Sequence, residues 1–137
     1  MKSTREDVVK EFHKTFTVEI DAEPTVELLQ SRRALIKEET EELFSDIDLA
    51  ISLLEQGKTV PRDVYINMLK ELADVQIVLS GTSVALKPLQ ELEEAFVRVS
   101  KSNMSKLGED GKPIHNEYCK VLKGPKYCKP DLSDLVS

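Results

Sequence analysis

The sequence predicts an all-α protein: a bundle of four helices over about residues 1–107, followed by an irregular tail over about residues 108–137. Apolar residues such as Val64, Met68 and Val75 recur with the three- and four-residue spacing of one helix face. Aromatic residues make up only 5% of the chain and Trp is absent, which suits a helical core of Leu, Ile and Val. A chain of 137 residues is long enough for one domain with its own core.

Capping residues and chain breakers divide the first part of the chain into four predicted helices. Thr4 and Thr25 are expected N-caps of the first two helices, because a threonine hydroxyl accepts a hydrogen bond from the first turn. Gly57 is expected to end the second helix. The remaining expected boundaries are Pro61, at the first helical position, and about Ala85 for the third helix, and Pro88 and about Lys106 to Gly108 for the fourth.

Acidic residues occupy two of the apolar helix faces. Glu71 falls on the stripe of the third helix, and Asp74 lies one turn further along the same side. On the second helix Glu39 and Glu42 stand at the same spacing within an apolar stripe that includes Leu43, Ile51 and Leu54. Each of these two helices is therefore expected to turn two carboxylates inward.

Four inward carboxylates need positive charge among them, because unpaired buried charge is costly and like charges raise one another's pKa. No Lys or Arg on these faces is an evident partner, whereas a hard divalent cation with oxygen ligands fits, Mg²⁺ or Mn²⁺ first. For the run from Glu38 to Glu42 alone, a solvated acidic helix face is the alternative. The matched second pair favours a metal site.

Charge and hydropathy exclude several classes of protein. The formal net charge of −6 argues against a general binder of nucleic acid or of an anionic membrane, although it is compatible with a nucleotide held through a metal. The chain has neither an apolar run of about 18 residues nor a signal-peptide pattern. We therefore expect a soluble, cytoplasmic protein whose cysteines, Cys119 and Cys128, are free thiols.

The acidic pattern resembles a known family. E-E-x-x-E at Glu38, Glu39 and Glu42, followed by E-x-x-D at Glu71 and Asp74, is similar to the motif of the all-alpha NTP pyrophosphohydrolase superfamily, which includes MazG, dimeric dUTPases and phosphoribosyl-ATP pyrophosphohydrolase. Further segments resemble its MazG-like, phosphoribosyl-ATP pyrophosphohydrolase-like branch: Val9-x-x-Phe12-His13, Arg33-x-Leu35-Ile36-x-Glu38-Glu39, Ser102-Asn103-Met104-Ser105-Lys106-Leu107 and Lys120-Val121-Leu122-Lys123-Gly124-Pro125.

The resemblance implies a MazG-like four-helix bundle that hydrolyses nucleoside triphosphates between the α and β phosphates, giving a monophosphate and pyrophosphate. This activity would serve nucleotide-pool house-cleaning in a homodimer or homotetramer. The residue roles that it implies are Mg²⁺ ligands at Glu39, Glu42, Glu71 and Asp74, a water-orienting or deprotonating group at Glu38, and nucleotide contacts at Asn103 and Lys106.

The tail carries lysines, whose charge is opposite in sign to that of the carboxylates in the bundle. Its lysines are Lys112, Lys120, Lys123, Lys126 and Lys129. We expect the tail to lie over the site, with Lys123 beside Gly124 binding phosphate oxygens; a solvated basic tail is the alternative. For the whole protein the rival hypothesis is a catalytically silent helical interaction or regulatory module that keeps the acids for a structural cation.

Overall fold

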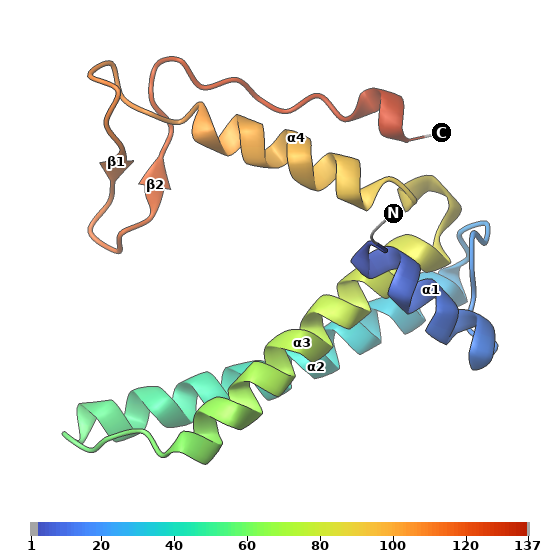
Figure 1. Cartoon of the computed structure of the whole chain (residues 1–137), viewed down its shortest axis with the longest axis horizontal. Helices are drawn as coiled ribbons and strands as arrows, with labels where there is room; N and C mark the ends of the chain where they lie inside the picture. The colour runs from blue at the N-terminus through green and yellow to red at the C-terminus, as the bar shows by residue number, and fades with distance from the viewer. Residues whose placement is uncertain (1–2, 137) are drawn as a thin grey trace. The chain divides into compact units, whose positions relative to one another are not determined.

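The computed structural model describes residues 3–136, and these are mostly helical, which confirms the all-α prediction (Figure 1). None of the helices in this range combines the length and apolar character needed to cross a membrane. The elements are α1 (Arg5–Thr15), α2 (Val26–Glu55), α3 (Arg62–Ala85), a 3₁₀ turn (Lys87–Leu89), α4 (Leu92–Met104), β1 (Ile114–His115), β2 (Val121–Leu122) and a second 3₁₀ turn (Ser133–Leu135).

The chain forms two compact units. Unit 1 comprises Met1–Pro88 and contains α1, α2 and α3, while unit 2 comprises Leu89–Ser137 and contains α4 and the tail. Within unit 1, α2 and α3 pack along each other and α1 packs against α3. A bundle that joins α4 to the other three helices stays a prediction.

The predicted starts of α1 and α2 are confirmed. Thr4 and Asp7 form a reciprocal capping box: the Thr4 hydroxyl accepts from the Asp7 N–H at 3.1 Å, and the Asp7 carboxylate accepts from the Thr4 N–H at 3.0 Å. The Thr25 hydroxyl accepts from the Leu28 N–H at 3.0 Å. Gly57, with φ +71°, follows the end of α2, as its sequence position indicated.

Two predicted boundaries were wrong. Pro61 is the extended N-cap of α3, one residue outside the helix. Pro88 does not open α4, which begins only at Leu92. After α3 the extended Leu86 bridges Ala22 in the loop between α1 and α2, and Pro88 lies in the 3₁₀ turn that follows.

The apolar core of unit 1 is small. Its buried apolar side chains are Val9, Leu43, Ala50, Val84, Ala85 and Leu86. Ile51 and Leu54, which the periodicity placed on the inward stripe of α2, are instead 49% and 57% exposed. The inward stripe therefore ends near Ala50, and much of the apolar surface of α2 and α3 remains exposed.

At Gly81 side chains from α1 and α2 lie close to the backbone of α3. A Cβ at this position would lie 2.6 Å from Nη2 of Arg32 and 3.1 Å from Nε2 of His13. The buried Arg32 donates from Nε to the Thr82 hydroxyl at 3.1 Å and from Nη2 to the Val78 carbonyl at 3.0 Å. A side chain at position 81 would therefore overlap Arg32.

Unit 2 shows that the tail is folded against α4 instead of being irregular throughout. β1 and β2 form a short antiparallel hairpin in which Ile114 faces Leu122. Beyond it the Ser102 hydroxyl donates to the Cys128 carbonyl at 2.6 Å, and Arg98 holds the Asp134 carboxylate through two hydrogen bonds of 2.6 and 3.1 Å.

Replacing Gly81 by Ala tests the helix contact. We expect Gly81→Ala to lower the free energy of unfolding by about 1–3 kcal/mol, because the added methyl group displaces the Arg32 guanidinium. In an Arg32→Leu background the same change should cost less, since alanine favours the helix once the overlap is relieved. Urea unfolding of the four proteins measures both values. Equal costs in the two backgrounds would show that Arg32 does not set the packing.

Candidate metal centre

The structure brings the four predicted inward acids together. Glu39 and Glu42 come from α2, and Glu71 and Asp74 come from α3, each pair three residues apart on its helix. One carboxylate oxygen from each residue lies within 4.8 Å of the others. Because α2 and α3 pack side by side, two pairs of acidic residues that are far apart in sequence form a single cluster (Figure 1).

Two oxygens of this cluster have no partner. Glu71 is only 6% exposed, and Glu39 is half-buried. Oε2 of Glu39 and Oε2 of Glu71 are buried and accept no hydrogen bond. An unsatisfied buried acceptor costs about 1–3 kcal/mol, and more when it is charged. The four oxygens fit a hard cation in number and chemistry, so the cluster could hold a metal ion.

The electrostatics of the cluster oppose full ionisation. Burial raises the pKa of Glu39, and the charges of Glu42 and Asp74 raise it further. Burial also raises the pKa of Glu71, as does the neighbouring carboxylate of Glu42, against the opposing effect of Lys70. A bound cation would oppose both shifts, because it favours the ionised form of each carboxyl group.

Lys70 corrects the expectation that no basic side chain serves these faces. Its ammonium lies 2.9 Å from Oδ2 of Asp74 and 3.5 Å from Oε1 of Glu71. The sequence pattern did not indicate Lys70, because this residue precedes Glu71 and its backbone lies off the inner face of α3. Its long side chain nevertheless reaches Asp74, four positions further along the helix. The Lys70 side chain is 64% exposed, and the buried oxygens of Glu39 and Glu71 remain unpartnered beside it.

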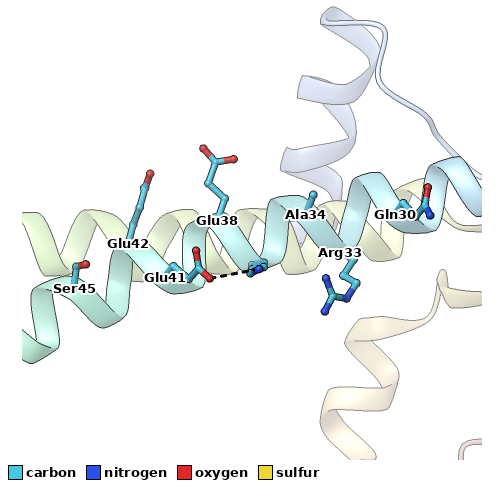
Figure 2. A pocket seen from close by; sticks show the side chains of 8 residues that line it. Gln30, Arg33, Ala34, Glu38, Glu41, Glu42 and Ser45 are labelled. Atoms are coloured by element: carbon cyan, nitrogen blue, oxygen red, sulfur yellow. Dashed lines mark ion pairs between the residues drawn. The ribbon is translucent and has the colours of Figure 1, made fainter.

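Glu38 lies outside the four-acid cluster but close to it. Its charge contributes to the raised pKa of Glu39. Figure 2 shows Glu38 and Glu42 projecting from the same side of α2. Both line an open depression along α2, whose other lining residues are Gln30, Arg33, Ala34, Lys37, Glu41 and Ser45. Glu38 is exposed and accessible to water.

The remaining predicted site residues belong to unit 2. Asn103 is exposed near the end of α4, and Lys106 follows the helix. Lys106 and Lys123, far apart in sequence, meet at the ring of Tyr127. Sequence reasoning did not select Tyr127; an aromatic residue three positions after Gly124 in a lysine-rich segment was the available signal. The placement of these residues over the four acids stays a prediction.

Neither the known protein-family models nor the curated proteins contain a significant match to this chain.

The pH dependence of stability tests the buried cluster. The folded pKa values of Glu39 and Glu71 are raised above the ordinary 4.5, so both groups bind protons more tightly in the folded state. Their destabilising effect is full above the folded pKa and absent below the unfolded value. With EDTA present, the free energy of unfolding should therefore rise as the pH falls from about 7.5 towards about 5. Urea unfolding at each pH measures it.

Two acid-to-amide variants extend this test: Glu71→Gln changes the cluster, and Glu41→Gln is the control. Glu71→Gln should stabilise the metal-free protein near neutral pH and flatten the pH dependence, because it removes one of the clustered charges. Glu41→Gln removes an exposed carboxylate that contacts only Lys37, at 3.9 Å, and should leave the slope unchanged. Equal slopes for wild type and Glu71→Gln would contradict the prediction.

Proposed function

We propose that the chain is a Mg²⁺-dependent nucleoside triphosphate pyrophosphohydrolase with a MazG-like four-helix fold. It would cleave (d)NTPs between the α and β phosphates, giving a monophosphate and pyrophosphate. The observation that carries the proposal is the cluster of four carboxylates within 4.8 Å of one another, with two buried oxygens lacking partners. The resemblance of the same residues to E-E-x-x-E and E-x-x-D supports it.

The choice of Mg²⁺, with Mn²⁺ as substitute, follows from the donor set. All four groups are carboxylates, and neither His nor Cys belongs to the cluster. Hard oxygen ligands suit Mg²⁺ and Mn²⁺, whereas Zn²⁺ sites more often include nitrogen or sulfur. When bound, such an ion polarises phosphoryl oxygens and makes a hydroxide-like water accessible near neutral pH.

The protein's own residues would have separate roles in the reaction. Glu39, Glu42, Glu71 and Asp74 would hold the ion. Glu38, exposed beside Glu42, would orient the attacking water and accept its proton. The water oxygen would bond to the α phosphorus. The bond between that phosphorus and the bridging oxygen would break, and its electron pair would leave with pyrophosphate.

Nucleotide contacts would come from unit 2. Asn103 and Lys106 match the N-x-x-K element, and Lys123 adds a second ammonium near Lys106. An ammonium acts on phosphate oxygens as a mobile point charge and neutralises part of the leaving group's charge. The negative net charge fits a small nucleotide substrate in the cytoplasm better than a nucleic-acid or membrane partner.

Association into a homodimer or homotetramer is part of the proposal. Large apolar side chains of α2 and α3 are exposed, among them Phe44 at 55%, Leu69 at 69% and Leu72 at 50%. Covering such side chains stabilises an assembly by about 25 cal/mol for each Å² of apolar surface removed from water. A second copy would thus add apolar burial to a core that is small in one copy.

A second candidate function is a catalytically silent interaction module with a structural cation. Lys70 favours it, because its ammonium already contacts Asp74 and Glu71 and partly neutralises the cluster without a metal. Turnover separates the two candidates.

Pyrophosphate release is the decisive measurement. With a panel of dNTPs and Mg²⁺ or Mn²⁺, we expect metal-dependent formation of pyrophosphate from at least one nucleotide. Glu42→Gln and Asp74→Asn should each abolish turnover, whereas Glu41→Gln, outside the cluster, should retain it. Orthophosphate as the primary product would contradict the α–β cleavage, and no turnover with any nucleotide would favour the silent module.

Sedimentation tests the assembly. At micromolar concentration we expect a mass of two or four times 15.5 kDa. Leu69→Glu should reduce the mass, because it places a charge on an exposed apolar side chain of α3 without disturbing the buried core. Leu69→Ala is the milder control. A single 15.5 kDa species for the wild type would contradict the proposal.

A further inference from the structure

Two lysines of unit 2 share one tyrosine ring. The Lys123 ammonium lies 4.9 Å from the centre of the Tyr127 ring, and the Lys106 ammonium lies 6.0 Å from it. An ammonium group is attracted to the face of an aromatic ring. Among residues 3–136 no carboxylate lies within 4.0 Å of either ammonium. The ring therefore gathers two positive charges that have no anionic partner of their own.

Gly124 is the reason the tail can come this close to α4. Its N–H donates to the Lys106 carbonyl at 2.8 Å, and its own carbonyl accepts from the Tyr127 N–H at 3.2 Å. A Cβ at this position would overlap the backbone carbonyl of Leu107. Only glycine permits this approach, and the approach sets Lys123 and Tyr127 beside Lys106.

Contacts further along the tail hold the same arrangement. The Ser102 hydroxyl of α4 donates to the Cys128 carbonyl at 2.6 Å, and the Cys128 N–H donates to the Ser105 hydroxyl at 2.9 Å. Cys128 directly follows Tyr127 and Gly124 lies three positions before it, so hydrogen bonds hold the backbone on both sides of Tyr127. The two lysines are thus brought together by backbone hydrogen bonding as well as by the aromatic ring.

We propose that Lys106, Lys123 and Tyr127 form a binding site for a diphosphate group that works without the metal centre. Adjacent phosphoryl groups offer oxygens to both ammonium groups, and charge-assisted hydrogen bonds would relieve the repulsion between them. Tyr127 acts as a positioning residue that holds the lysines through its ring. The choice of a diphosphate rests on the proposed function, because it is part of the triphosphate substrate and is the product itself.

Calorimetric titration of the full-length protein with pyrophosphate, in EDTA, tests this site. We expect binding by the wild type and a loss of about tenfold or more in affinity for Lys123→Ala, since a charged contact disappears. Lys126→Ala is the matched control, an exposed lysine of the same tail without a contact to the ring, and should change affinity less than about twofold. Orthophosphate, with one phosphoryl group, should bind more weakly than pyrophosphate.

Changes that leave every charge in place test the geometry. Tyr127→Phe should bind as the wild type does, because it keeps the ring, whereas Tyr127→Leu should weaken binding. Gly124→Ala should also weaken binding by moving the tail away from Leu107. Thermal melts show whether each variant is folded.

Several outcomes would overturn the site. They are no pyrophosphate binding by the wild type, equal losses for Lys123→Ala and Lys126→Ala, or full affinity in Tyr127→Leu. The result is separable from the proposed activity. Metal-free binding that depends on Lys123 supports the site even if no nucleotide is hydrolysed, and hydrolysis without such binding supports the activity alone. Glu42→Gln should lose turnover and keep metal-free pyrophosphate binding.

Discussion

Clustered negative charge between α2 and α3, which Lys70 offsets only in part, is the constraint on which unit 1 depends. The four carboxylates repel one another, and two of their oxygens are buried without partners, so the helix pair must be held together by other contacts. A small apolar core provides part of that stabilisation. In a protein whose net stability is typically about 5–15 kcal/mol, this is a large internal cost, and a bound cation would turn it into an attraction.

Polar contacts between the first half of α2 and the last turns of α3 also hold these two helices together. Arg32 is buried and bound to Thr82 and the Val78 carbonyl, one turn beyond Asp74 on α3. Gly81 provides the space that the guanidinium occupies. Arg32 thus joins α2 to α3 through two hydrogen bonds, at a point where α3 has no side chain.

Unit 2 also has a glycine at a close approach, here beside positively charged side chains. Gly124 lets the tail backbone meet the end of α4, and two lysines gather there at Tyr127. At Gly81 the absent side chain leaves room for the Arg32 guanidinium, and at Gly124 it leaves room for the backbone of Leu107.

The sequence by itself determined the helical class, the starts at Thr4 and Thr25 and the pairing of acids within each helix, because these depend on neighbouring residues and on the helical period. Tertiary structure decided that the two acid pairs meet, that Lys70 reaches Asp74, and that α4 starts late. It also decided that Tyr127 collects Lys106 and Lys123. These features join residues far apart in sequence or depend on side-chain reach, and only the packing of the folded backbone sets such distances.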